Sequence, residues 1–232
     1  MKNKSGQIHK SGKVNFDEFA AAFLYKTLKR IETVVDGKIN IALSGGTTPL
    51  PVLEKLKQQQ INWERYNFFM VDERCVSIEN ESSNFGNINK IFFKDISSKS
   101  FSMILKDTSF TESVGSYKVT IKEQITKRVG SFAQFDLILL GMGDDGHTAS
   151  LFPDTEGLSE ENEIVIINKV PQLNAERITL TYPVILNASE IIVMVKGKSK
   201  EKIIDDIYSG KSVGYPMGKI AREHSNIKWL IA

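Results

Sequence analysis

The sequence predicts an α/β fold in which a mostly parallel β-sheet is flanked by helices on both faces. Short apolar segments alternate along the chain with amphipathic segments of helical periodicity. Several apolar segments stop abruptly at glycine-rich or charged turns, as parallel strands covered on both faces do. At 232 residues the chain has the size of a single α/β domain. We therefore expect one domain over residues 1–232, in which residues 1–13 form a flexible polar segment.

The N-terminal half contains two predicted strand, turn and helix units after a first helix. That helix covers residues 15–35, where apolar side chains recur at helical spacing and polar side chains stand near its start. A strand over 39–43 then leads through a glycine-threonine turn into a helix at about 50–59. The second unit has a strand over 67–71, a break at 72–74 and a helix over 84–93.

The C-terminal half continues the alternation. Its elements are predicted from apolar runs bounded by glycine or charge and from helical periodicity. They are a helix over 113–128, strands over 137–140, 164–167, 178–181 and 191–195, a helix near 200–208 and a closing strand over 228–231.

Composition favours a small-molecule partner. Hydrophobic residues make up 41% of the chain and charged residues 25%, as in other globular proteins, and the formal net charge of +2 is too small to indicate nucleic acid. Cys75 is the only cysteine, which excludes an intramolecular disulfide. The sequence shows neither an export signal nor an apolar run of membrane-spanning length. We expect a cytoplasmic protein with no membrane or nucleic-acid partner.

The most informative segment is residues 135–150, where a buried-strand pattern ends in a glycine-rich turn holding Asp144, Asp145 and His147. Parallel sheets bind their ligands just beyond the carboxyl ends of the strands, so these side chains are expected in a crevice. A histidine there can exchange a proton near neutral pH, with a carboxylate to orient it. A structural turn with a surface histidine is the alternative, but the strand, the aspartates and the glycine spacing together favour a functional site.

The turn Ser44–Pro49 stands where a strand becomes a helix, so its backbone N–H groups are suited to an anion such as phosphate. It lacks the lysine of a Walker loop and the dinucleotide fingerprint. A tight structural connection is the competing interpretation, and the position at a strand end favours the phosphate cradle.

Cations form the third group of candidates. Arg74, in the triplet Asp72-Glu73-Arg74, follows an apolar strand, and its guanidinium suits a phosphate. Arg177 and Lys200 also stand at predicted strand edges, although most cations of a globular protein simply face solvent. Cys75 has no activating base nearby in the sequence and is interpreted as a spectator thiol. We assign no role to His9 or His224.

Five segments in order resemble the 6-phosphogluconolactonase family, within the wider group that holds the glucosamine-6-phosphate deaminases. They are residues 43–49, 72–74 with 83–84, 141–153, 177–181 and 197–200. Two of them separate the subgroups: a deaminase typically has tyrosine in place of Arg74, and it continues after the histidine with a run that supplies a glutamate. This chain has Arg74 and the run Thr148–Pro153. It departs from the family at Cys75, where an aromatic residue is common, and around Tyr215–Met217.

The resemblance implies hydrolysis of 6-phosphogluconolactone to 6-phosphogluconate, the second step of the oxidative pentose phosphate pathway, without metal or organic cofactor. His147 is expected to be the general base and Asp145 to orient it, although one of the two aspartates could instead support the turn. The expected substrate-binding residues are Ser44, Gly45, Gly46, Thr47, Asp72, Arg74, Arg177 and Lys200. Which cation meets the phosphate stays open, as does the choice between monomer and homodimer. The alternatives are a deaminase-like isomerase and a non-catalytic sugar-phosphate binding protein.

Overall fold

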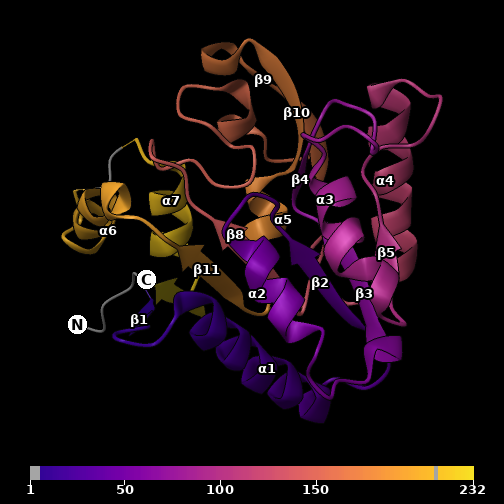
Figure 1. Ribbon diagram of the computed structural model, residues 1–232. Coiled ribbons are helices and arrows are strands. Elements are labelled where there is room, and N and C mark those ends of the chain that lie inside the picture. Colours follow the sequence, from indigo (N-terminus) through magenta and orange to yellow (C-terminus); the bar gives the residue numbers. More distant parts are fainter. Residues whose placement is uncertain (1–5, 212–213) are drawn as a thin grey trace.

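The centre of the protein is a seven-stranded sheet, which the computed structural model shows in Figure 1. The structure describes residues 6–211 and 214–232. The strand order is β1-β12-β11-β8-β2-β3-β5, and each neighbouring pair is parallel. The strands are β1 (Gln7–Lys10), β2 (Ile39–Leu43), β3 (Tyr66–Met70), β5 (Lys99–Phe101), β8 (Leu137–Gly141), β11 (Ile191–Val195) and β12 (Ile227–Ile231).

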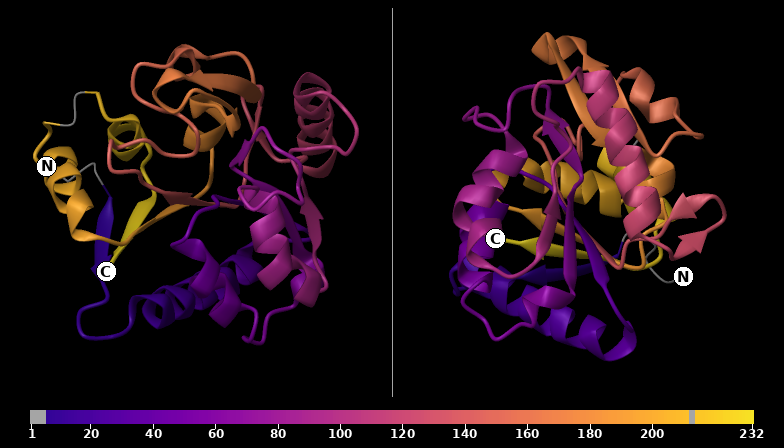
Figure 2. Two further views of the ribbon diagram at one scale, coloured as in Figure 1. Left: turned by 45° about the horizontal axis from the view of Figure 1, so that its top comes forward. Right: turned by 90° about the vertical axis from the view of Figure 1, so that its right-hand side faces the viewer.

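Helices cover both faces of this sheet (Figure 2). They are α1 (Phe16–Val34), α2 (Pro49–Leu56), α3 (Asn84–Ile91), α4 (Phe110–Gln124), α5 (Tyr182–Leu186), α6 (Glu201–Tyr208) and α7 (Pro216–Glu223). Alternate strand residues point to opposite faces. On one face, Ile41 of β2 packs with Leu24 of α1 and Leu53 of α2. On the other face, the Phe69 ring of β3 lies 6.3 Å from the Tyr117 ring of α4.

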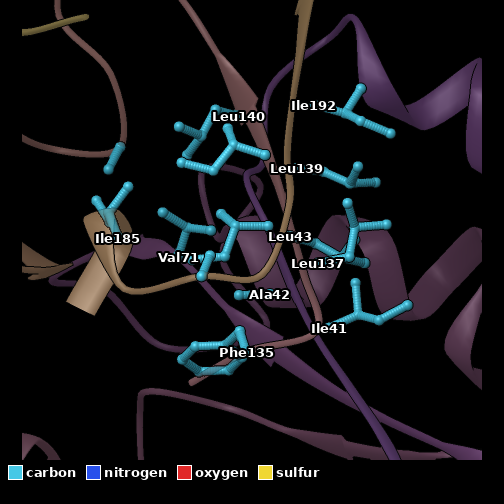
Figure 3. Packing of buried hydrophobic residues seen from close by; sticks show 14 of the residues in the cluster. Ile41, Ala42, Leu43, Val71, Phe135, Leu137, Leu139, Leu140, Ile185 and Ile192 are labelled. Carbon is cyan, nitrogen blue, oxygen red and sulfur yellow. The ribbon is translucent and has the colours of Figure 1, made fainter. Parts of the chain in front are cut away.

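The central strands are buried on both sides, as the sequence predicts for a covered parallel sheet. Figure 3 shows side chains of β2 and β8 packed together in the core. Leu137, Ile138 and Leu140 are 0% exposed and Leu139 is 3% exposed. Burying one such side chain contributes about 1.5–3 kcal/mol, so this strand is a rigid support for the loop that follows it.

A second, antiparallel sheet stands beside the central one. It consists of β4 (Asp72–Arg74), β10 (Ala175–Leu180) and β9 (Val165–Val170), in that order. A small hairpin pairs β6 (Arg128–Val129) with β7 (Phe132–Ala133). The strand β3 ends at Met70, so the predicted break before residues 72–74 is confirmed, but these residues then form a strand of the second sheet, which was not predicted. Their pairing partner lies about a hundred residues later in the chain, so no local pattern reveals it.

The predicted fold class is confirmed, and most predicted elements are present within a few residues. The helix predicted at 113–128 instead starts at Phe110, because the Ser109 side chain and Glu112 form a capping box there. Residues 1–13 were expected to be a flexible segment, but residues 7–10 form the edge strand β1, paired with β12. The part of that expectation that concerns residues 1–5 lies outside the described residues. Among the described residues, no helix is both long enough and apolar enough to span a membrane.

Candidate active site

A cleft with a volume of about 210 Å³ lies at the carboxyl ends of the central strands. It is formed by loops after β2, β8 and β11 and by residues of β4. The chain runs from β2 to β3 and β5 on one side, and from β8 to β11 and β12 on the other. The cleft therefore stands where the strand order reverses, which is the usual ligand position in an open α/β sheet.

The structure brings most of the predicted site residues together. The cleft is lined by Ser44, Gly45, Gly46, Thr47, Asp72, Arg74, His147 and Lys200. Asp145 and Arg177 instead line an adjoining depression, which shares Arg74 and His147 with the cleft. Arg74 and His147 thus stand between the two hollows.

His147 is held by its neighbour two residues earlier. The Asp145 Oδ1 atom lies 2.5 Å from His147 Nδ1, and it also accepts a hydrogen bond of 3.0 Å from the His147 backbone N–H. A carboxylate only accepts, so Nδ1 carries the proton and Nε2 is left as the basic nitrogen. Burial raises the pKa of Asp145, but the hydrogen bonds and charge of His147 outweigh it, and the net pKa is lowered. The Phe152 ring stacks on the imidazole at 4.0 Å.

Glycines allow this loop its close turns. A Cβ atom on Gly143 would lie 2.1 Å from His147 Nδ1, so a side chain there would displace the imidazole. Gly146 has φ of +76°, a conformation that favours glycine, and its carbonyl accepts a hydrogen bond of 3.0 Å from the backbone N–H of Met217. The Asp145–His147 geometry is therefore set by backbone as well as by side chains.

The glycine-threonine turn approaches a side chain of α3 very closely. A Cβ atom on Gly45 would lie 1.9 Å from Oδ1 of Asn84, and Asn84 Nδ2 donates a 3.0 Å hydrogen bond to the Asp72 carbonyl. The Ser44 hydroxyl is buried and has no hydrogen-bond partner among the described residues. A buried hydroxyl without a partner is costly, so this donor in the lining of the cleft suits an oxygen-rich ligand.

Asp72 and Glu73 are both buried, but their carboxylates bond to different parts of the protein. Asp72 accepts a 2.7 Å hydrogen bond from the Ser150 hydroxyl at the cleft, and burial raises its pKa against the opposing effects of Ser150, Arg74, His147 and Arg177. Glu73 points toward α3 and accepts hydrogen bonds from the backbone of Asn84 and Phe85 and from the Ser83 hydroxyl. Glu73 therefore fixes the start of α3.

Two arginines lie side by side on neighbouring strands of the antiparallel sheet. Arg74 and Arg177 are register partners of β4 and β10, and neither belongs to an ion pair among the described residues. Arg74 donates a 2.5 Å hydrogen bond to the Ser82 carbonyl. Burial and the charge of Arg74 lower the pKa of Arg177. Like charges directly opposite each other are destabilising, and an anion between them would remove that repulsion.

Lys200 closes the 3-10 turn η5 (Lys198–Lys200) after β11 and reaches the cleft from its far side. The turn begins at Gly197, whose φ of +117° favours glycine. The sequence predicts one group of cations at strand edges, formed by Arg74, Arg177 and Lys200. In the structure Arg74 lines the cleft together with Lys200, whereas Arg177 lines only the adjoining depression.

The remaining sequence candidates lie apart from this chemistry. Burial raises the pKa of the Cys75 thiol to about 11, as expected of a spectator thiol. His224 is buried, with its Nε2 2.8 Å from the Ala188 carbonyl oxygen. Ser150 and Phe152 were not predicted to belong to the site, but Ser150 contacts Asp72 and Phe152 contacts His147. Both lie in the segment after the histidine, but their partners could not be read from spacing. Among the described residues, no group of three or more His, Cys, Asp or Glu side chains is arranged to hold a metal ion.

Residues 15–229 match the family described as glucosamine-6-phosphate isomerases/6-phosphogluconolactonase, and the chain belongs to this family. The 6-phosphogluconolactonase of Chlamydia pneumoniae is 33% identical over 84% of this chain and 76% of its own length. That of Nostoc sp. is 31% identical over 88% of this chain and 87% of its own length. The family resemblance predicted from the sequence is thus confirmed.

Solved structures show the same fold. The 6-phosphogluconolactonase of Thermotoga maritima has a TM-score of 0.82 at 27% identity, over 97% of this chain and 99% of that one. The enzyme of that name from Trypanosoma brucei has a TM-score of 0.84 at 26% identity, over 97% and 95%. A monomeric glucosamine-6-phosphate deaminase has a TM-score of 0.77 at 19% identity, which shows the fold alone.

Proposed function

We propose that this chain is a cytoplasmic 6-phosphogluconolactonase, which hydrolyses 6-phosphogluconolactone to 6-phosphogluconate in the oxidative pentose phosphate pathway. The observation that carries the proposal is the Asp145–His147 pair, with 2.5 Å between Oδ1 and Nδ1, at the edge of a cleft that also contains cations and an anion-binding turn. A base held by a carboxylate serves to activate water, and the curated relatives named above carry the name of this activity.

We place the substrate with its phosphate toward the glycine-threonine turn. Residues 44–47 and Lys200 all line the cleft, and they offer an anion backbone N–H groups, the unpartnered Ser44 hydroxyl and an ammonium group. The lactone carbonyl is then directed toward His147. Arg74, which stands at the boundary of the two hollows, and Arg177 beside it are the cations available to the oxyanion and to the new carboxylate.

In the proposed reaction, His147 Nε2 takes a proton from a water molecule while the water oxygen forms a bond to the lactone carbonyl carbon. Asp145 stabilises the resulting imidazolium through Nδ1, and the negative charge moves to the carbonyl oxygen near Arg74. When this tetrahedral intermediate collapses, the bond to the ring oxygen breaks, and the imidazolium returns its proton to that oxygen. The product is an open-chain acid that ionises to the carboxylate. General base catalysis of this kind contributes roughly 10²–10⁴-fold in rate.

Two alternative functions fit the structure less well. A deaminase would place a glutamate after the histidine, but Asp72 is the only carboxylate among the described residues that line the cleft. A non-catalytic sugar-phosphate binding protein would have no use for a histidine base oriented by a carboxylate. The likeness to a deaminase at 19% identity concerns the fold and does not favour that activity.

The test measures lactone hydrolysis above the spontaneous rate, with the wild type and His147→Ala side by side. We expect the variant to lose most of the acceleration while it still binds 6-phosphogluconate, because the phosphate contacts are made by other residues. His224→Gln is a matched control, since that histidine lies outside the cleft. An acceleration in His147→Ala equal to that of the wild type would refute the mechanism. Ammonia release from glucosamine-6-phosphate would favour the deaminase.

A further inference from the structure

The two adjacent aspartates of the histidine loop contact different elements. Asp145 contacts His147, whereas Asp144 Oδ1 accepts a 2.8 Å hydrogen bond from the Ser199 hydroxyl. Ser199 is the residue directly before Lys200, in the turn after β11. A carboxylate on the loop after β8 thus holds the turn that carries Lys200.

This contact is well placed to determine where Lys200 stands. The lysine side chain is long and flexible, and Lys200 has no ion-pair partner among the described residues. Its position therefore depends on its backbone. The turn contains Gly197 at φ of +117° and three residues of 3-10 helix, which is little regular structure to fix it. The Asp144–Ser199 hydrogen bond supplies a side-chain contact to the loop after the neighbouring strand β8.

The loop that carries Asp144 and His147 is also held by residues at the start of α7. The Tyr215 ring packs against Gly146, where a Cβ atom would lie 2.7 Å from a ring carbon, and the Met217 N–H donates to the Gly146 carbonyl. These contacts hold the loop whether or not Ser199 is bonded. Breaking the Asp144–Ser199 contact should therefore release the Lys200 turn and leave the His147 loop in place.

We propose that Asp144 is a positioning residue for substrate affinity: through Ser199 it holds Lys200 over the phosphate-binding part of the cleft. This inference rests on the proposed function in that the anion is taken to be the phosphate of the substrate. Asp144 does not act on the reacting bond. The two aspartates therefore have different roles: Asp145 orients the base His147, and Asp144 positions the cation Lys200.

The consequence is a change in affinity without a change in chemistry. The net contribution of a typical hydrogen bond corresponds to about a twofold to tenfold effect when it is lost, and the exposure of Asp144 and Ser199 to water keeps this bond in that range. Asp144→Ala and Ser199→Ala should each raise KM by about that factor and weaken binding of inorganic phosphate similarly, with kcat and its pH profile unchanged. Because both variants break one contact, the double variant should be no weaker than either single variant.

Asp144→Asn separates positioning from charge. Asparagine keeps an acceptor oxygen for Ser199 but removes the negative charge, so positioning predicts a KM near that of the wild type. A carboxylate that acts only by repelling the anion predicts that Asp144→Asn and Asp144→Ala both bind phosphate more tightly. Ser209→Ala is the matched control, because Ser209 is an exposed serine at the end of α6 whose hydroxyl bonds to the Asp206 carbonyl, away from the cleft.

The experiment combines lactone kinetics with calorimetric titration of inorganic phosphate and of 6-phosphogluconate into the full chain. A coupled loss of affinity in Asp144→Ala and Ser199→Ala, restored by Asp144→Asn, supports the inference. Unchanged affinity in Ser199→Ala, additive losses in the double variant, or a wild type that binds neither anion would overturn it. If the wild type binds phosphate but does not accelerate lactone hydrolysis, the proposed function fails while the titrations still decide the role of Asp144.

Discussion

The close approach of Gly45 to Asn84 makes a quantitative prediction. A Cβ atom on residue 45 would lie 1.9 Å from Oδ1, 2.1 Å from Cγ and 2.7 Å from Cβ of Asn84. Asn84 is 2% exposed and is held by its hydrogen bond to the Asp72 carbonyl, so it cannot move without cost. Gly45→Ala should therefore displace Asn84 from the start of α3.

The cost has two parts. Inserting a methyl group into a packed region costs about 1–3 kcal/mol. Losing the buried hydrogen bond from Asn84 Nδ2 costs about 1 kcal/mol more. We therefore expect Gly45→Ala to lower the free energy of unfolding by roughly 2–4 kcal/mol. Urea denaturation measures this value, and lactone kinetics on the folded fraction should show a raised KM, because the turn belongs to the cleft.

Removing the obstructing side chain should relieve the variant. Asn84→Ala alone loses the hydrogen bond, but it also removes Oδ1 and Cγ, the two atoms nearest to the added Cβ, and leaves only the Cβ of residue 84 at 2.7 Å. Gly45→Ala should therefore cost much less stability in the Asn84→Ala background than in the wild type. This requires a coupling free energy of about 1–3 kcal/mol between the two positions.

Gly46→Ala is the matched control for this pair. Gly46 has φ of +97° and no atom within 4 Å of its missing Cβ, so the substitution costs backbone strain of about 1–3 kcal/mol. Asn84→Ala should not relieve this strain. Two results would show that the reasoning is wrong. One is that the changes in the free energy of unfolding for Gly45→Ala and Asn84→Ala simply add in the double variant. The other is that the free energy of unfolding of Gly45→Ala lies within about 0.5 kcal/mol of the wild-type value, which is the usual effect of a surface substitution.

Two further predictions concern carboxylates of the site. Asp145→Asn should lower kcat by about 10–100-fold and change KM by no more than about twofold. The reason is the loss of a charge-assisted hydrogen bond to the imidazolium, which is worth about 1.5–3 kcal/mol. Steady-state kinetics across pH test this prediction, and an unchanged kcat would contradict it. Burial raises the pKa of Asp72 in the folded chain, so the wild type loses stability as pH rises from the unfolded pKa to the folded one. The stability of Asp72→Asn relative to the wild type should therefore increase with pH over that interval in urea denaturation, whereas a relative decrease would exclude the assigned direction.

Local patterns were sufficient for the elements whose own residues determine them. Residues 137–140 are all apolar, and a short continuous apolar run is typical of a strand that is buried on both faces of a parallel sheet. The first helix begins after Asn15 because that side chain caps it, with 2.9 Å to the Asp17 N–H. The helix predicted from residue 113 started too late, since its capping box at Ser109 was not recognised.

Pairing over long distances was beyond such patterns. The strand β1 is polar and largely exposed, and it exists because β12 offers a backbone edge to it. The strand β4 is charged, and it pairs with β10 through backbone hydrogen bonds that do not depend on its side chains. Backbone pairing leaves no periodic mark in the side chains of a short edge strand, so hydropathy cannot reveal it.

The sequence by itself determined the fold class, the family, and the presence of a histidine with aspartates beside it in a loop after a buried strand. Those features are local, or are carried by ordered motifs along the chain. Only the tertiary structure decided which residues meet. It paired Asp145 with His147 and Asp144 with Ser199, and it placed Lys200 and Arg177 in different hollows. Asp145 and His147 belong to one loop, but the Asp144–Ser199 contact and the lining of the two hollows join segments that follow separate strands. Their geometry therefore depends on how the whole sheet packs rather than on spacing in the chain.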